Sequence, residues 1–420
     1  MTKSRHVLAL IALLILLGIS LLACLALIRA LPGRYAYYLP QPLQELRHDP
    51  HPDTLPTPVI TRTIQPLRPT PPPTWTPTLL PTPIPTTTPT PSPIPSPTLP
   101  ASLILTGLRH EHQGWNNCGP TTLAMALSYW GRDETQYDVA PALKPDPEDK
   151  NVSPWEMEAY TRGLGLGAIV RVGGTLDRLK ALIRAGFPVI VETWYVRDPS
   201  DQMGHYRLII GYNDATGQFT TYDSLHGPDV PIGYQELDEL WRVFNRVYLV
   251  AYAPERWDAL TTVLGPDLGD AAMYERALET ARVEATAPPA ACVAYADCAD
   301  WVTFSWFSAG SSLTSLGRHA EAAAAYDQAL RLGLHYRMLW YQFGPYESYY
   351  AVGRYDDVTA LAEATLATTN NLEESYYWRG KARLAQGNDD GARADFEAAL
   401  RYHENWPPAA VALAEMEIVN

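Results

Sequence analysis

The chain has 420 residues, which is more than one ordinary domain holds and predicts at least two folded units with accessory segments. Its formal net charge of -14 at pH 7 excludes nucleic acid and anionic membrane surfaces as general partners, because both attract basic patches. The spacing of its four cysteines fits no zinc ribbon or finger. We therefore expect a multi-domain protein with no metal, no cofactor and no nucleic acid.

Residues 1–33 are dominated by an apolar run from Val7 to Ile28, preceded by Lys3 and Arg5. Its 22 residues (28 − 7 + 1) can span about 30 Å of hydrocarbon as a helix, and the run is longer than the apolar core of a cleaved signal peptide. We interpret it as a transmembrane signal anchor, single-pass in the cell membrane, with a cytoplasmic tip and extracytoplasmic C-terminal domains. A lipoprotein box ending at Cys24 is the alternative, and the apolar residues that follow this cysteine disfavour it.

Residues 34–100 are expected to form a juxtamembrane segment and a stalk. The stretch from Pro50 to Pro100 holds 19 of the 38 prolines, interleaved with Thr and Ser. This composition offers few backbone donors and little to bury, and is typical of disordered polyproline-type spacers. Its 51 residues (100 − 50 + 1) would reach about 150 Å when fully extended at ~3.1 Å per residue.

Residues 101–253 are predicted to form one α+β unit. The pattern indicates an entering strand near Leu103, and then an amphipathic helix that begins near Cys118 and closes at Gly131. Capping residues and glycines delimit further helices, and apolar runs indicate strands. These further elements are helices over 155–162 and 175–185, and strands over 188–193, 204–212 and 218–223.

The last two of these strands form a predicted β-hairpin around the turn 213–217. His205 lies at the start of the first strand and Asp223 at the end of the second, so both face the open end of the hairpin. Directly paired residues in such positions have Cβ atoms about 5 Å apart. The hairpin therefore predicts a histidine that is held by a carboxylate.

Cys118 opens its predicted helix five residues after Gln113 (118 − 113). Free N–H groups and the helix dipole favour a thiolate there, so we expect the cysteine pKa to lie below its usual ~8.5. In the predicted site, Cys118 attacks an amide or ester carbonyl and His205 is its base. Asp223 would orient the imidazole, and Gln113 with the Cys118 backbone N–H would hold the oxyanion.

Three other histidines lie near these residues in the sequence. His110 and His112 alternate as metal ligands can on a strand, but no third ligand is evident, so we expect them at the edge of a groove or in solvent. His226 closely follows Asp223 and is a rival base. A strand-paired His205 is the better candidate.

The order glutamine, cysteine, histidine, aspartate, with a helical cysteine and strand-borne partners, resembles papain-like cysteine peptidases. The motifs look more closely like the double-glycine-leader peptidase group, cysteine-peptidase family thirty-nine in its stand-alone form: Gln113, Asn117-Cys118-Gly119-Pro120, Gly204-His205 and Tyr222-Asp223. This closer resemblance extends over roughly residues 108–250 and implies a papain-like fold and peptide hydrolysis. That family often spaces its glutamine and cysteine one residue further apart, at a position that His112 holds here.

Residues 254–420 change to helices rich in Ala, Leu, Tyr and Trp. Gly317, Gly353 and Gly387 recur at intervals of 36 and 34, close to the ~34-residue tetratricopeptide period. The first and third repeats keep the expected bulky and small positions, whereas the middle repeat is degenerate. We expect a short all-α solenoid resembling tetratricopeptide repeats, preceded by a helix over 270–284. It either binds a protein partner or caps and positions the peptidase unit.

Together these patterns predict a membrane-anchored, extracytoplasmic cysteine peptidase-like hydrolase that cleaves a peptide or protein amide bond. Outside the cell, Cys292 and Cys298 would form a disulfide, and buried thiols are the alternative. Two other functions stay open. One is a non-catalytic cell-surface adaptor that binds peptides or proteins through a peptidase-like groove and the repeats. The other is a thiol acyltransferase or cell-wall amidase. The intact Cys118, His205 and Asp223 favour an enzyme.

Overall fold

The computed structural model describes residues 2–31, 35, 39–40, 43, 54–58, 100–198, 201–291 and 299–419. The side chains of residues 2–13, most of the predicted stalk, and the pair Cys292 and Cys298 lie outside this description. Helix α1, Thr2–Ala30, contains the segment from Val7 to Ile28. Among the fully described residues, no helix is long and apolar enough to cross a membrane.

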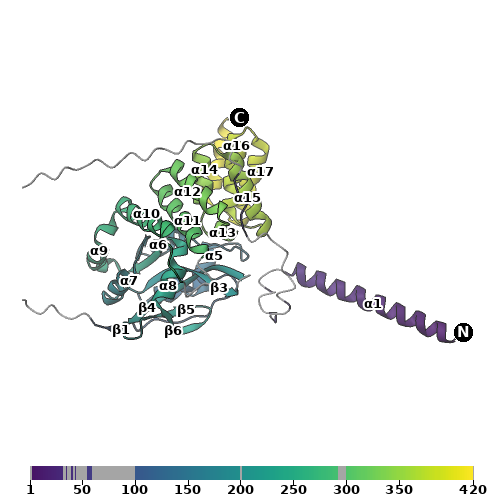
Figure 1. The fold of residues 1–420 in the computed structure, drawn as a ribbon, viewed down its shortest axis with the longest axis horizontal. Coiled ribbons are helices and arrows are strands. Elements are labelled where there is room, and N and C mark those ends of the chain that lie inside the picture. The colour runs from purple at the N-terminus through teal and green to yellow at the C-terminus, as the bar shows by residue number, and fades with distance from the viewer. Residues whose placement is uncertain are drawn as a thin grey trace, which may run out of the picture.

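The strands of the described chain form one antiparallel sheet of seven strands in the lower part of the view in Figure 1. Its order is β2-β7-β3-β4-β5-β6, and β1 pairs with β4 beside the main path. The strands are β1 Ser102–Ile104, β2 Gly167–Arg171, β3 Val189–Asp198, β4 Asp201–Asn213, β5 Gln218–Asp223, β6 Gly227–Gly233 and β7 Tyr248–Tyr252.

Helices pack around this sheet: α4 lies against β3, β4 and β5, and α7 lies against β1, β3 and β4. The α-helices of this part are α4 Cys118–Ser128, α5 Gln136–Leu143, α6 Pro154–Gly163, α7 Leu176–Arg184, α8 Tyr234–Trp241 and α9 Trp257–Leu264. Three short 3-10 helices accompany them, η1 Arg242–Phe244, η2 Pro254–Arg256 and η3 Gly265–Leu268.

The predicted helix boundaries agree with the capping contacts. The Ser153 hydroxyl accepts a hydrogen bond from the Glu156 backbone N–H at the start of α6, and Thr175 caps α7 in the same way. Gly131 and Gly186 follow α4 and α7 with φ values of 75° and 79°. This left-handed backbone is one that glycine adopts at little cost, so both glycines end their helices as expected.

The strands β3 and β4 are longer than the sequence predicts. They pair from Val189 opposite Ile209 as far as Asp198 opposite Asp201, whereas the prediction ended the first strand at 193 and began the second at 204. Polar residues between these limits favour a loop on local propensity alone. Pairing between the two strands overrides that preference on either side of residues 199–200, which lie outside the description.

Helices fill the rest of the chain, above the sheet in Figure 1. The three periodic glycines 317, 353 and 387 each sit between two antiparallel helices with φ between 70° and 78°, which confirms the predicted repeat turns. The helices are α10 Asp270–Thr286, α11 Ala299–Ser315, α12 His319–Arg331, α13 Met338–Tyr341, α14 Gly344–Ala351, α15 Tyr355–Thr368, α16 Glu373–Ala385, α17 Asp389–Tyr402 and α18 Pro407–Val419.

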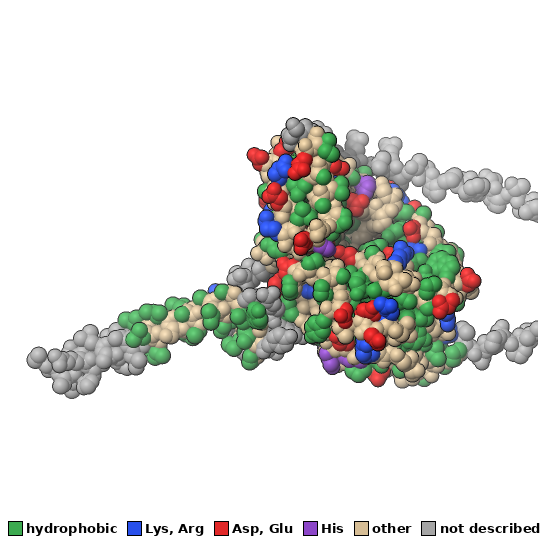
Figure 2. Space-filling view, turned by 180° about the vertical axis from the view of Figure 1, so that it is seen from behind, with side chains coloured by type: hydrophobic (Ala, Val, Ile, Leu, Met, Phe, Trp, Pro, Cys, Tyr) green, Lys and Arg blue, Asp and Glu red, His purple; other side chains and the backbone are tan. Residues whose placement is uncertain are grey.

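The sheet and the helical array share one hydrophobic core. Trp194 of β3 is fully buried, with its ring centroid 5.8 Å from that of Phe304 in α11 and 5.3 Å from that of His335. Seen from behind, the two parts close around a hollow between the helical array and the sheet (Figure 2). The helices therefore pack on the sheet and do not hang from it as a separate module.

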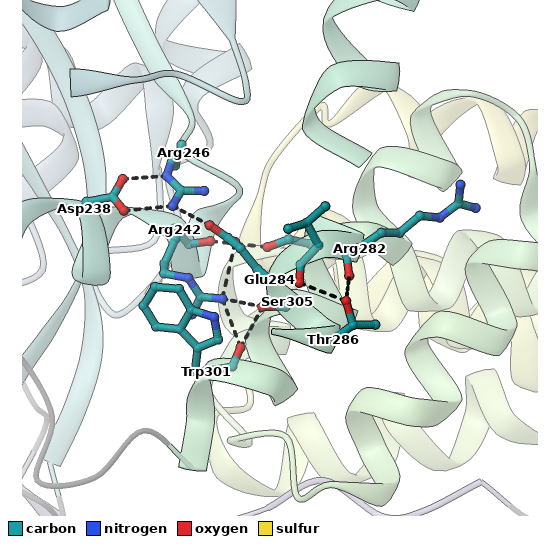
Figure 3. Close-up of polar contacts among 10 residues, drawn as sticks. Asp238, Arg242, Arg246, Arg282, Glu284, Thr286, Trp301 and Ser305 are labelled. Atoms are coloured by element: carbon teal, nitrogen blue, oxygen red, sulfur yellow. Dashed lines mark hydrogen bonds and ion pairs between the residues drawn. The ribbon is translucent and has the colours of Figure 1, made fainter. Parts of the chain in front are cut away.

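A buried cationic contact joins η1 to α10 and α11 (Figure 3). The Arg242 guanidinium lies 3.6 Å above the Trp301 ring centroid, and it donates to the Trp301 carbonyl at 2.9 Å and to the Ser305 hydroxyl. Arg246 donates to the Glu284 carboxylate of α10 at 2.6 Å. Because these charges are shielded from water, removing either partner would cost much more than breaking a surface pair.

A short stretch of the predicted stalk is docked on the helical array. Leu55 is only 4% exposed, its N–H donates to the Leu334 carbonyl at 3.0 Å, and Thr54 forms an antiparallel bridge with His335. The Pro100 carbonyl, at the other end of the proline-rich stretch, accepts a hydrogen bond from the Tyr212 hydroxyl. Among the described residues of this stretch, Thr54, Leu55 and Pro100 thus contact the folded body, which departs from the prediction of an uninterrupted spacer.

Candidate active site

Cys118 is the first residue of α4, and its sulfur lies beside β4. The Tyr206 backbone forms a hydrogen bond with this sulfur that lowers the cysteine pKa, as only an N–H donor to a thiolate can. The Tyr206 carbonyl accepts a hydrogen bond from the Thr122 hydroxyl at 3.4 Å. Two contacts from α4 thus fix Cys118 next to the residue that follows His205.

His205 and Asp223 meet as the hairpin prediction requires. Nε2 of His205 lies 3.0 Å from Oδ1 of Asp223, and the two side chains are 4% and 0% exposed. The two residues are not directly paired, because Asp223 lies opposite Arg207 and His205 precedes Arg207 by two residues in β4. Residues two apart share a strand face, so the imidazole reaches the carboxylate diagonally.

Asp223 is held in its ionised form. Burial opposes ionisation, but the hydrogen bond from His205 and the charge of Arg207 hold the pKa of Asp223 well below its usual range. Nε of Arg207 lies 3.1 Å from Oδ2, and the backbone N–H groups of Leu225 and His226 donate to Oδ1 at 2.9 and 3.1 Å. Both carboxylate oxygens of Asp223 therefore accept hydrogen bonds, which fixes the orientation of the carboxylate.

The expected low pKa of Cys118 is wrong. Burial raises the pKa of the Cys118 thiol above its ordinary value, and the neighbouring Glu192 carboxyl raises it further. Burial also lowers the pKa of His205, against the pull of Asp223. The helix N-terminus and the Tyr206 N–H favour the thiolate, but desolvation outweighs them. Thiol and imidazole are both neutral at neutral pH.

Gln113 lies on the loop before α4 and is tied to the strand end. Its backbone N–H donates to the Ser224 carbonyl at 2.9 Å, and its side-chain oxygen accepts from the Ser224 hydroxyl at 2.8 Å. In this arrangement the oxygen of the carboxamide faces Ser224, and the amide N–H groups face away from it. The structure thus brings Gln113 to the end of β5, next to Asp223.

The other histidines take no part in the contact between His205 and Asp223. Nε2 of His110 lies 3.0 Å from the Asp223 carbonyl oxygen, and His112 is exposed. The His226 ring packs 5.5 Å from that of Tyr195. In the described part of the chain, no group of His, Cys, Asp and Glu residues could hold a metal ion.

The sequence did not single out three buried residues around the site. Arg207 is signalled only by its position two residues after His205 on one strand face. Lys144 donates to the carbonyls of Pro147 and Asp149 at 3.1 and 3.3 Å, and its charge favours the Cys118 thiolate. The third, Gln136, lies in the first turn of α5, where no local pattern marks it.

Gln136 braces the loop that leads to Cys118. Its side-chain oxygen accepts from the Gly114 N–H at 2.6 Å and from the Asn117 amide at 3.0 Å. Its side-chain nitrogen donates to the Glu111 carboxylate at 2.8 Å and to the His112 carbonyl at 2.7 Å. All the hydrogen bonds that a carboxamide can form are thus used to hold one loop.

Residues 106–251 match the model of the Peptidase_C39 like family, and residues 305–332 match a tetratricopeptide repeat model. No curated protein matches the chain. Among solved structures, one described provisionally as a C39-like peptidase from Bacillus anthracis is 17% identical. The match covers 36% of this chain and 96% of that one, with a TM-score of 0.28. The chain is therefore similar to the Peptidase_C39 like family over residues 106–251, and to a tetratricopeptide repeat over residues 305–332 in the helical region.

Proposed function

We propose that the chain is a thiol hydrolase that cleaves a peptide or protein amide bond through Cys118, His205 and Asp223. The observation that carries the proposal is the 3.0 Å contact between His205 and Asp223, next to the residue whose backbone binds the Cys118 sulfur. A binding module has no need of a buried imidazole that is held by a carboxylate, one residue before the strand position that binds a cysteine sulfur. The Peptidase_C39 like match over residues 106–251 supports the same class.

The proton moves between the sulfur and one ring nitrogen. Because Asp223 holds Nε2–H of His205, Nδ1 is the basic nitrogen. It takes the thiol proton as the Cys118 sulfur attacks the carbonyl carbon, and the C=O electron pair moves to oxygen. The tetrahedral intermediate then expels the amine, which receives that proton, and a thioester is left. Water deprotonated by His205 hydrolyses the thioester and restores the thiol.

The negative charge that develops on the carbonyl oxygen in the tetrahedral intermediate must be stabilised by hydrogen-bond donors. The Gln113 side-chain nitrogen is assigned to this oxyanion together with the Cys118 backbone N–H, which belongs to the free N-terminal turn of α4. The contact between Ser224 and the Gln113 side-chain oxygen supports the assignment, because it leaves the amide N–H group as the donor end. Each such donor typically contributes about 10²–10³ in kcat.

The electrostatics favour general-base catalysis over a preformed ion pair. The pKa of Cys118 is raised and that of His205 is lowered, so the proton leaves the thiol only as the carbon–sulfur bond forms. A neutral imidazole is the correct protonation state for that step.

Membrane anchoring belongs to the same proposal. The segment from Val7 to Ile28 is long enough to span a bilayer once, with the two folded parts extracytoplasmic and the helical repeats positioning a protein substrate or partner. Carbonate extraction of membranes from cells that express the full chain tests the anchor. Recovery of the intact chain in the soluble fraction would contradict it.

Labelling of Cys118 by a peptidyl epoxide at pH 7, located by mass spectrometry, tests the chemistry. We expect no labelling of residue 118 in Cys118→Ala and a loss of about 10²-fold or more in His205→Ala, in line with the contribution of a general base. His226→Ala is the matched control and should label as the wild type does. Equal rates in His205→Ala and wild type would refute the proposal.

Product analysis separates the reactions that a thiol of this kind can perform. The active chain would be incubated with peptide libraries and with peptidoglycan fragments, each with and without an added amine nucleophile. Peptide products that contain water at the new carboxyl terminus identify a peptidase. Products from peptidoglycan alone, or the absence of hydrolysed peptide when the amine is left out, would contradict the proposed peptidase reaction.

A further inference from the structure

One edge of β4 is left open where β5 ends. The pairing of β5 with β4 stops at Arg207 opposite Asp223, so the next residues of β4 have no strand beside them on that side. In an antiparallel sheet, the N–H and C=O groups of one residue point to the same neighbour. The N–H of Tyr206 binds the Cys118 sulfur and its C=O binds Thr122. Helix α4 therefore takes the place of the missing strand.

Tyr341 occupies the next position along the same edge. The Gly204 backbone forms a hydrogen bond with the Tyr341 hydroxyl, and Gly204 precedes Tyr206 by two residues, so the N–H groups of both residues point to the same side. Two residues of strand correspond to about 7 Å. The Cys118 sulfur and the Tyr341 hydroxyl thus line one edge, with His205 between their attachment points.

Two further observations place Tyr341 at the site. A Cβ atom on Gly204 would lie 3.1 Å from Cζ of both Tyr341 and Phe244, so the Tyr341 ring packs directly against the backbone of Gly204. A charge on the Cys118 sulfur would raise the pKa of Tyr341 further, which is consistent with both groups lying along this edge of β4. Burial raises the pKa of Tyr341, so its hydroxyl keeps its proton and can donate a hydrogen bond at neutral pH.

Tyr341 belongs to α13, within the helical array and far from Cys118 in the sequence. This short helix lies between α12 and α14, where the predicted middle repeat is degenerate. The departure from the repeat pattern therefore coincides with the segment that reaches the open edge of β4.

We propose that Tyr341 is a substrate-positioning residue, supplied by the helical array to the Cys118 site. The proposal rests on the thiol hydrolase function proposed above. The Tyr341 ring forms the wall of the substrate cleft on the Gly204 side of the thiol, and its hydroxyl donates a hydrogen bond to a carbonyl of an extended peptide lying along that edge. The wall limits the side chain that fits there, so the site is complete only when both parts of the chain are present.

The test compares two reagents on the full chain. Iodoacetamide is small and reports the intrinsic reactivity of the thiol, whereas a peptidyl epoxide also reports peptide positioning. In Tyr341→Phe, we expect the epoxide rate constant to fall about tenfold, the order of one hydrogen bond of ~1.4 kcal/mol, while the iodoacetamide rate stays within twofold. In Tyr341→Ala, the labelling rate constant of an epoxide with a bulky side chain next to the warhead should rise relative to that of an epoxide with alanine at the same position.

Tyr346→Phe is the matched control, because it removes a buried hydroxyl of the array that binds Thr365 and Ser375. It should leave both rates unchanged. Thermal denaturation checks that each variant folds, and if Tyr341→Ala does not fold, Tyr341→Phe decides the question. Unchanged epoxide rates in Tyr341→Phe would overturn the proposal, as would equal losses with both reagents. Failure of the hydrolase proposal is seen separately, as equal labelling of His205→Ala and wild type.

Discussion

Replacing Arg207 by methionine tests how the buried charges at the site depend on one another. The Arg207 side chain is 8% exposed, and its Nε lies 3.1 Å from the Asp223 carboxylate. Methionine keeps an unbranched apolar stem but leaves Asp223 with one cation fewer. Breaking a buried pair costs about 3–5 kcal/mol. Because the Leu225 and His226 N–H groups still bind the carboxylate, we expect the lower end, about 3 kcal/mol.

The same change has a signature at His205. The charge of Arg207 lowers the pKa of His205, so Arg207→Met should raise this pKa and move the acid limb of Cys118 alkylation to higher pH. Guanidinium denaturation measures the first effect, as a lower midpoint at unchanged slope, and iodoacetamide rates from pH 4 to 9 measure the second. Arg197→Met is the control, because its ion pair with Asp201 is 3.7 Å long and the arginine side chain is 42% exposed. It should cost less than about 0.5 kcal/mol.

The reasoning fails if Arg207→Met is as stable as Arg197→Met and keeps the wild-type acid limb. That outcome would mean that the other donors to Asp223 suffice to hold the carboxylate. A lower midpoint with an unmoved acid limb would separate the two effects and limit Arg207 to a structural role.

Three further predictions follow from the contacts. Gln136→Leu leaves the part-buried Gly114 N–H and the buried Asn117 amide without their acceptor. It should lose about 2–4 kcal/mol, at ~1–2 kcal/mol for each donor, with slower epoxide labelling in the same preparation. Burial raises the pKa of Asp149 to about 7. The stability that this carboxyl contributes is therefore complete below its unfolded pKa of ~3.9 and is lost as the pH rises through about 7, by at most ~1.4 kcal/mol per pH unit. Asp149→Asn should flatten that decline in denaturation curves. Cysteines at Thr54 and His335 should form a disulfide under mild oxidation, and Leu55→Asp should abolish it, whereas equal cross-linking with and without that change would mean that the docking contact does not form.

Local patterns accounted for the parts of the site that neighbouring residues determine. The turn and alternation around 213–217 give the hairpin, and the hairpin alone brings His205 to Asp223 at 3.0 Å. The cysteine at the start of α4 was equally visible. Its pKa was not, because the helix terminus acts locally, while the burial of the thiol and the charge of Glu192 depend on residues that are distant in the sequence. A pattern in one segment cannot report which distant side chains exclude water from it.

The helical array illustrates the same limit on a larger scale. Periodic glycines predict these turns because helices often end in a left-handed residue, which glycine adopts at little cost. The period says nothing of what the array packs against. Trp194 and Phe304 meet in one core, and the degenerate middle repeat contributes Tyr341 to the edge of β4. A repeat that packs only against neighbouring repeats keeps the residues of the repeat pattern. Where the residues depart from that pattern, the departure is the sequence signal that the repeat also packs against another part of the chain.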